Sequence, residues 1–278
     1  SKRPAILVVQ GDTNSSLAGA LAAVKLHIPV AHVEAGLRSY DKTMPEELNR
    51  IIIDHMSSVL FAPTEVSKKC LLNEGIESEQ VHVTGNTIVE ALEENVPIAE
   101  MKSNILRALG LEKKKYILVT VHRQENVDDR KRLENIMSAL GAIADQENYD
   151  VIYPMHPRTK KMLLTFGIVM PSNVRVMDPL GYFDFLQLEK NAAVILTDSG
   201  GLQEEACILN VPCVTVRDNT ERPETVLCGA NIIVGTAQKN ICDAIVKQQN
   251  KNITWEQPFG KQGTICMKMK EILMKYIV

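Results

Sequence analysis

The sequence predicts an α/β protein with parallel sheets, and three observations support that prediction. Short runs of β-branched and apolar residues alternate with stretches of helical period from end to end, which is the pattern of βαβ units. The chain has 278 residues, of which 45% are hydrophobic, enough to bury a core in one large domain or two ordinary ones. The strand-like runs fall into two sets, separated by a helix-forming stretch that contains Pro97.

Ten segments are predicted to form strands, because each is short and rich in β-branched or apolar residues. The first set comprises residues 5–9, 30–33, 59–62 and 81–84. The second set comprises residues 116–121, 151–153, 174–177, 194–197, 213–216 and 232–234. We therefore expect one sheet of four strands and a second sheet of six.

Pro97 marks the expected boundary between the two sets, because proline inside a helix removes a backbone hydrogen bond and interrupts the helix. We expect an N-terminal domain over residues 1–96 and a C-terminal domain over residues 97–263. The last segment, 264–278, places its apolar residues on one helical face, as a docking helix would: Ile265, Met269, Ile272 and Tyr276. We expect this helix to complete the N-terminal domain.

Composition and charge favour an enzyme that acts on a small molecule. The formal charge is −3 at pH 7, and acidic and basic residues are mixed along the chain, so no basic surface for nucleic acid is indicated. No apolar run approaches the ~20 residues that span a bilayer, and the first residues do not look like a signal peptide. We expect a cytoplasmic protein with neither a nucleic-acid nor a membrane partner.

The cysteines and histidines give no sign of a metal site. The six cysteines show no CxxC spacing and lie mostly in apolar stretches, so we expect buried free thiols. The six histidines form no HxxxH or HExxH pair. No GxGxxG follows a predicted strand, which argues against NAD. We expect neither a metal nor a cofactor.

Acidic residues follow the first two predicted strands, at the edge where open parallel sheets bind their ligands. Asp12 follows the first strand, and Glu34 and Arg38 follow the second. Asp12 alone could equally be a turn or N-cap residue, and Glu34 and Arg38 could form a surface salt bridge. Glu46 lies in the first turn of a predicted helix, where an acid complements the helix dipole, so a structural role competes with a catalytic one.

Histidine, arginine and glycine residues follow the strands of the second set. His122 and Arg123 follow its first strand and His156 follows its second, and such pairs suit an anionic ligand, although a lone histidine is more often structural. Residues 198–205 are predicted to form a strand end, a glycine turn and a helix start, whose N–H groups can cradle a phosphate. A carboxylate in that helix can accept the hydroxyls of a ribose, and the arginines of residues 217–224 can bind a diphosphate.

In this order, the motifs closely resemble the non-hydrolysing UDP-N-acetylglucosamine 2-epimerases. The resemblance rests on segments spread over nearly all of the chain: residues 11–13, 32–38, 45–50, 84–87, 122–123, 198–205 and 220–224. It implies two Rossmann-like domains of the GT-B-like type, with the active site in the cleft between them. It also implies interconversion of UDP-N-acetylglucosamine and UDP-N-acetylmannosamine, with UDP-N-acetylglucosamine and UDP as ligands and a homodimer as the assembly.

The resemblance also carries residue roles over to this sequence. The acid–base or electrostatic groups would be Asp12, Glu34, Glu46 and His122. The residues that hold UDP would be Ser199, Gly200, Gly201, Glu205, Arg222 and Asn86, with Glu205 at the ribose. Arg123 and His156 match positions that bind a second, regulatory substrate molecule in bacterial members, and Arg38 is a further candidate contact.

Inversion at C2 of the sugar explains why such residues are needed. The C2 hydrogen has no adjacent carbonyl, so its direct removal is prohibitively hard. Loss of UDP from C1 with removal of the C2 proton gives 2-acetamidoglucal, and re-addition of UDP with protonation from the other face inverts C2. This route needs an acid–base group on each face of the sugar and a clamp for an anion.

Three other functions stay open at this point. A glycosyltransferase of the same architecture would share the fold and the UDP site, but it would not need three carboxylates at one sheet edge. A hydrolysing epimerase would instead release free N-acetylmannosamine. A binding module would recognise UDP-sugars without turnover.

The start of the chain suggests a segment upstream of these residues. The chain begins almost directly in a predicted strand, and the first predicted sheet is the smaller one. The resembled family has a further N-terminal βα segment with a glycine–arginine loop, and no counterpart of it is found here. We expect its absence to leave an exposed sheet edge and to weaken activity.

Overall fold

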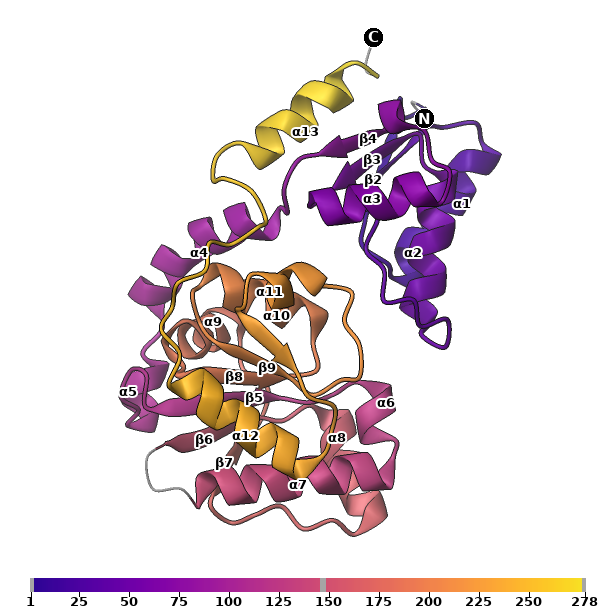
Figure 1. The fold of residues 1–278 in the computed structure, drawn as a ribbon. Helices are drawn as coiled ribbons and strands as arrows, with labels where there is room; N and C mark the ends of the chain where they lie inside the picture. Colours follow the sequence, from indigo (N-terminus) through magenta and orange to yellow (C-terminus); the bar gives the residue numbers. More distant parts are fainter. Residues whose placement is uncertain (1–2, 146–148, 277–278) are drawn as a thin grey trace. The chain divides into compact units, whose positions relative to one another are not determined.

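The structure is a computed structural model that describes residues 3–145 and 149–276. The chain divides into two compact units (Figure 1), of which one combines Ser1–Ala91 with Pro258–Val278 and the other is Leu92–Gln257. Each unit contains one parallel sheet. Among the described residues, no helix is both long and apolar enough to cross a membrane.

The first unit is built on a four-stranded parallel sheet with the strand order β1-β2-β3-β4. Its strands are β1 Leu7–Gln10, β2 Val30–Val33, β3 Val59–Ala62 and β4 Val81–Val83. The register pairs Gln10 with Val33, the last residues of their strands. The loops that carry Asp12 and Glu34 therefore leave the sheet at the same edge.

Two helices of the first unit are capped at their starts by a threonine side chain. The helices of this unit are α1 Asn14–Lys25, α2 Pro45–Met56, α3 Glu65–Asn73, the short 3-10 helix η1 Ser78–Gln80, and α13 Ile265–Met274. Thr13 and Thr64 accept the backbone N–H groups of Ser16 and Ser67 at the starts of α1 and α3, which supplies partners that the first turn lacks. α2 instead begins with Pro45, which needs no N–H partner there.

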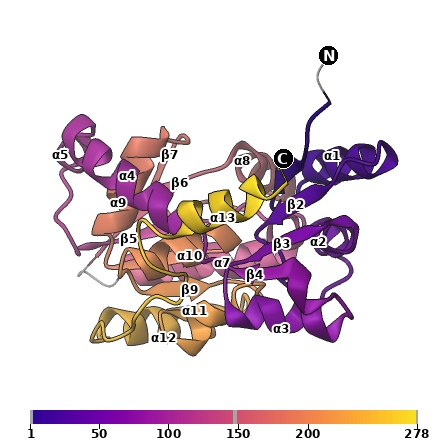
Figure 2. The same cartoon turned by 90° about the horizontal axis from the view of Figure 1, so that it is seen from above.

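The second unit is built on a six-stranded parallel sheet with the order β10-β9-β8-β5-β6-β7. Its strands are β5 Tyr116–Thr120, β6 Asp150–Pro154, β7 Val174–Met177, β8 Val194–Thr197, β9 Cys213–Thr215 and β10 Asn231–Ile233. Figure 2 shows β5, β6 and β7 following one another across the sheet. The order reverses direction at β5, where ligands of open α/β sheets bind.

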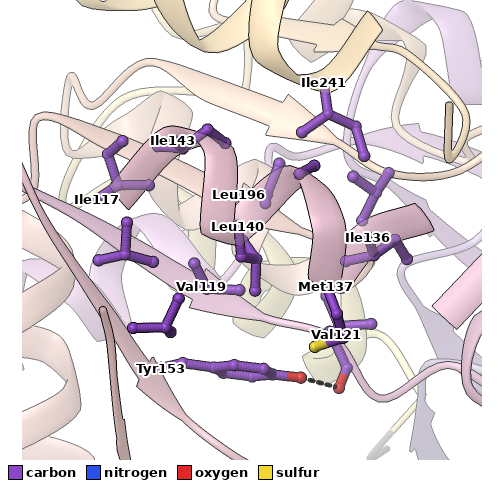
Figure 3. Packing of buried hydrophobic residues seen from close by; sticks show 14 of the residues in the cluster. Ile117, Val119, Val121, Ile136, Met137, Leu140, Ile143, Tyr153, Leu196 and Ile241 are labelled. Atoms are coloured by element: carbon purple, nitrogen blue, oxygen red, sulfur yellow. Dashed lines mark hydrogen bonds between the residues drawn. The ribbon is translucent and has the colours of Figure 1, made fainter. Parts of the chain in front are cut away.

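Helices cover both faces of this sheet. They are α5 Ile105–Leu109, α6 Gln124–Val127, α7 Arg130–Ala144, α8 Pro157–Phe166, α9 Tyr182–Asn191, α10 Gly200–Ile208, α11 Pro223–Leu227 and α12 Gln238–Gln249. Ile117 of β5 lies in a buried cluster with Leu140 of α7 and Ile241 of α12 (Figure 3). Leu118, the next residue, lies in a second cluster with Leu188 of α9. Successive side chains of a strand point to opposite faces, so β5 buries apolar side chains on both faces of the sheet.

All ten predicted strands are present, and the predicted division into sheets of four and six is confirmed for the described residues. The interruption expected at Pro97 is wrong, because helix α4, Ile88–Lys102, continues through this residue. Leu92 and Ala99 are both buried on this helix. Packing of that face offsets the backbone hydrogen bond that a proline removes.

The C-terminal helix α13 belongs to the first unit. Ile265 is fully buried, and its backbone N–H donates to Glu90 Oε1 over 2.9 Å. Met269 is also buried, but Tyr276 is exposed, so the predicted apolar face is covered only over the first turns. Residues 277 and 278 of the predicted segment lie outside the described residues.

The six cysteines are all free, and their burial is uneven. Cys207 and Cys213 are buried, as expected for thiols in apolar stretches. The expectation of burial is wrong for Cys266, which is exposed on α13. Its neighbour Ile265 occupies the buried face of that helix instead.

Candidate functional site

Asp12 lies between β1 and α1, where Arg50 of α2 holds its carboxylate. Asp12 Oδ2 accepts Arg50 Nη2 at 2.5 Å and Nε at 3.1 Å. The guanidinium is almost fully buried, whereas a quarter of the Asp12 side chain is exposed. The ion pair therefore fixes a carboxylate that solvent and ligands can still reach.

Glu34 follows β2 in an uncommon backbone conformation. Its φ is +70°, in the left-handed region that side-chain-bearing residues rarely adopt. Its Oε1 accepts Gln10 Nε2 over 2.9 Å, and its Oε2 lies 3.9 Å from the position that a Cβ would take at Gly11. The Glu34 carboxylate therefore lies over the loop that carries Asp12.

The two acids in the first turn of α2 differ in their surroundings. Glu47 is buried and accepts the backbone N–H groups of Ser39 at 2.9 Å and Tyr40 at 2.8 Å, together with Arg50 Nη1 at 3.0 Å. Glu46 is half-buried and lies one helical turn before Arg50. Glu47 therefore organises the loop before α2, and α2 connects Glu46 to the arginine that holds Asp12.

Arg38 and Asn86, two further candidate contacts, are buried and make structural bonds. Arg38 Nη1 lies 2.8 Å from Asp54 Oδ2, and Arg38 Nη2 lies 2.7 Å from Glu74 Oε2. The Asn86 backbone N–H donates to Phe259 O at 2.8 Å, and its Oδ1 accepts the Ile88 N–H at 3.1 Å. Asn86 therefore stabilises the start of α4.

In the second unit, Asp198 anchors the loop that carries His122. Asp198 follows β8 and is fully buried. It accepts the backbone N–H groups of His122 at 3.0 Å and Arg123 at 2.9 Å, and Asn126 Nδ2 at 3.1 Å. His122 Nδ1 also lies 3.2 Å from Asp198 Oδ1. A carboxylate at the end of one strand thus orients a histidine at the end of its neighbour.

A pocket of about 180 Å³ opens at the carboxyl ends of β5 and β6 within this unit. Its lining includes His122, His156, Leu180, Phe185 and Ser199. The His122 and His156 rings lie 5.8 Å apart, and His156 Nδ1 accepts the Arg158 N–H at 3.1 Å. The lining thus combines apolar side chains with two histidines and the N-cap residue of α10. Such a lining suits a flat ring joined to an anionic group.

The glycine turn after β8 leads into α10, and its shape depends on the absence of a side chain. Ser199 is the N-cap of α10, with its Oγ 3.5 Å from the Leu202 N–H. A Cβ at Gly200 would collide with Glu221 Oε1, whereas a Cβ at Gly201 would meet only Ser199 Oγ at 4.0 Å. Glu221 is itself held by Arg217, whose Nη1 donates to it at 2.8 Å.

Arg222 and Glu205 flank this turn. Arg222 is almost fully buried, and its Nε lies 2.8 Å from Glu204 Oε1. Glu205 of α10 is hydrogen-bonded to Glu189, a buried residue of α9. Burial, reinforced by repulsion from Glu205, raises the pKa of Glu189 well above its usual range, and burial also raises the pKa of Glu205.

A family model for UDP-N-acetylglucosamine 2-epimerases matches residues 1–273 of this chain. The chain belongs to this family. A UDP-N-acetylglucosamine 2-epimerase from Methanocaldococcus jannaschii is 52% identical over 265 residues, which are 93% of this chain and 72% of that protein.

Solved structures of epimerases agree with this assignment. The M. jannaschii UDP-GlcNAc 2-epimerase in complex with UDP-GlcNAc and UDP aligns with a TM-score of 0.92 at 51% identity, over 98% of this chain and 76% of that one. The Neisseria meningitidis UDP-GlcNAc 2-epimerase bound to UDP-GlcNAc aligns with a TM-score of 0.88 at 35% identity, over 98% of this chain and 76% of that chain. The predicted fold class, α/β with two Rossmann-like domains, is thereby confirmed.

The structure of this epimerase brings several predicted residues together within each unit. Asp12 and Glu34 lie on adjacent loops of the first sheet. In the second unit, His122, His156 and Ser199 line one pocket. Among the residues that the structure describes, no cluster of three or more histidine, cysteine or acidic side chains could hold a metal ion.

Sequence reasoning missed three acidic residues that shape these loops. Asp198 directly follows β8, and its position at a strand end could have identified it from the sequence. Asp54 lies in the last turn of α2 and Glu189 lies in α9, and both are buried. Nothing in their local sequence distinguishes them from acids on a solvent-exposed helix face, because their partners come from distant segments.

Proposed function

We propose that this epimerase interconverts UDP-N-acetylglucosamine and UDP-N-acetylmannosamine without releasing free sugar. The observation that carries the proposal is the pair of partly exposed carboxylates, Asp12 and Glu34, on adjacent loops at the carboxyl edge of the first sheet. Inversion at C2 needs proton transfer on both faces of the sugar. Two fixed acids on separate loops therefore favour epimerisation over transfer of the sugar to an acceptor molecule.

The reaction proceeds by elimination and re-addition. A carboxylate takes the C2 proton while the bond from C1 to the UDP oxygen breaks, which leaves UDP and 2-acetamidoglucal. The UDP oxygen then bonds to C1 again, and C2 receives a proton from the opposite face. Asp12, Glu34 and Glu46 supply the acid–base and electrostatic groups, and His122 stabilises the departing diphosphate.

The second unit offers groups suited to binding UDP. The N-terminus of α10, with Ser199, Gly200 and Gly201, offers backbone N–H groups and a favourable dipole to a phosphate. Glu205 accepts the ribose hydroxyls, and Arg222 contributes positive charge to the diphosphate. The pocket of about 180 Å³ beside Phe185 takes the base.

The remaining candidate residues have smaller parts in this proposal. Arg123 and His156 border the nucleotide site and are candidates for contacts with a second substrate molecule. Asn86 and Arg38 act through the backbone segments that they hold. We place the protein in the cytosol, because its six free thiols fit a reducing compartment. We also propose that it acts as a homodimer.

Incubation with UDP-N-acetylglucosamine alone tests the proposal. We expect UDP-N-acetylmannosamine to form, at an equilibrium reached from either sugar. Free N-acetylmannosamine with UDP would instead indicate a hydrolysing epimerase. Turnover only after an acceptor is added would indicate a glycosyltransferase, and binding without any product would indicate a binding module.

A further inference from the structure

The loop that carries Glu34 is held in a conformation that the backbone does not favour by itself. Glu34 has φ +70° and Gly36 has φ +83°. A side chain at Gly36 would collide with the carbonyl oxygen of Ser67 and would come within 2.9 Å of Leu71 Cγ. A left-handed conformation at a residue with a side chain persists only where surrounding contacts enforce it.

Asp54 provides those contacts from the last turn of α2. Its side chain is fully buried. Its Oδ1 lies 2.6 Å from His32 Nδ1, and its Oδ2 accepts the Gly36 N–H at 3.2 Å and Arg38 Nη1 at 2.8 Å. One carboxylate therefore holds residues on both sides of Glu34.

His32 extends this connection to the loop of Asp12. Its ring is fully buried, and its Nε2 lies 3.0 Å from the carbonyl oxygen of Gly11, the residue before Asp12. The His32 ring therefore bridges the Asp54 carboxylate and the backbone of the loop that carries Asp12. Arg38 pairs with both Asp54 and Glu74, and this pairing offsets the cost of burying the Asp54 charge.

We propose that Asp54 is a positioning residue that fixes the Glu34 and Asp12 carboxylates relative to one another through Gly36 and His32. This inference rests on the proposed function for its catalytic consequence. Asp54 does not contact the substrate, because its side chain is fully buried. Loss of Asp54 should therefore lower turnover, because small displacements of reacting groups slow the reaction strongly.

Asp54→Asn tests the inference with little change in shape. The amide keeps a single acceptor oxygen, which cannot face both His32 and Gly36, and it removes the negative charge that pairs with Arg38. We expect kcat to fall ~10- to 100-fold while UDP affinity stays within about twofold, because positioning is lost and the nucleotide residues are untouched. His32→Phe should cause a similar loss, and the double variant should lose little more than either single variant.

Glu74→Gln is the matched control. Glu74 accepts Arg38 Nε and Nη2, each at 2.7 Å, on the other side of that guanidinium from Asp54. The substitution disturbs the same buried network without removing the carboxylate that holds Gly36 and His32. We expect it to lower stability and to leave kcat within about threefold of the wild type.

Amide hydrogen exchange of Gly36, resolved by NMR, tests the positioning independently of any activity. We expect this N–H to exchange at least ~10-fold faster in Asp54→Asn than in Glu74→Gln, because the neutral amide is a weaker acceptor than the carboxylate, which Glu74→Gln leaves in place. Unchanged exchange together with wild-type kcat would overturn the inference, as would a kcat loss that Glu74→Gln reproduces. A wild-type protein without epimerase activity would refute the proposed function, and Gly36 exchange would still decide whether Asp54 holds the loop.

Discussion

At the scale of single residues, the acidic side chains of the first unit differ in their burial and in the donors that bind them. Glu47 is buried under two backbone N–H groups and Arg50. Asp12 is bound by the same Arg50 yet stays partly exposed. Burial with several donors favours a structural carboxylate, whereas partial exposure with a fixed orientation favours a catalytic one.

Asp12→Asn and Glu34→Gln should each lower kcat by ~10²-fold or more and leave UDP affinity nearly unchanged, because each removes an acid–base group and no nucleotide contact. Steady-state kinetics and calorimetry with UDP measure the two quantities. Glu65→Gln, in the first turn of α3 at an exposed position, is the control for loss of an acid. Near-normal turnover in both variants would remove these carboxylates from the mechanism.

Arg222→Ala and Glu205→Ala should weaken UDP binding by ~10-fold or more, because a bound diphosphate and ribose need charged and hydrogen-bonding partners. Lys160→Ala removes a largely exposed cation from the same unit and serves as the control. Titration calorimetry with UDP gives the affinities directly. Wild-type affinity in both Arg222→Ala and Glu205→Ala would exclude the proposed nucleotide contacts.

At the scale of elements, strand ends and helix starts position the candidate site. The strands were predictable because local β-branched runs such as residues 194–197 are enough to identify them. The strand-end loops were predictable because parallel strands share one carboxyl edge. The contacts of Asp54 with His32 and of Glu189 with Glu205 were not predictable, since each depends on how separate elements pack.

Gly200→Ala should destabilise the start of α10 by ~1–3 kcal/mol, because its Cβ would collide with a glutamate that is itself buried and held. Gly201→Ala adds the same methyl group where the nearest atom is 4.0 Å away, so its stability should stay within ~0.5 kcal/mol or rise through better helix propensity. Denaturant unfolding of the two variants measures the difference. Equal stabilities would contradict the collision.

At the scale of the whole molecule, the buried Glu189 and its half-buried partner Glu205 make folding stability depend on pH. Burial and mutual repulsion raise the pKa of Glu189, so the folded state binds its proton more tightly than the unfolded state does. Its contribution to stability is therefore complete at pH values below the usual glutamate pKa. It is lost as pH rises through the raised pKa.

Glu189→Gln removes this titration and keeps a hydrogen-bond donor toward Glu205. We expect the free energy of unfolding of the wild type to fall relative to that of Glu189→Gln as pH rises from about 5 to 8. Urea unfolding of both proteins at each pH gives the difference, in which titrating groups that do not interact with Glu189 cancel. A difference that does not change with pH would show that Glu189 is ionised in the folded protein throughout.

The most direct test of the account is epimerisation of UDP-N-acetylglucosamine in deuterated water, followed by NMR and mass spectrometry of the product. Elimination and re-addition exchange the C2 hydrogen with solvent through carboxylates on opposite faces of the sugar. We expect deuterium at C2 of UDP-N-acetylmannosamine, and an oxygen label in the bridge from C1 to UDP should move into non-bridging positions of the β-phosphate. Full retention of the original C2 hydrogen, with the label still in the bridge, would contradict the proposed chemistry.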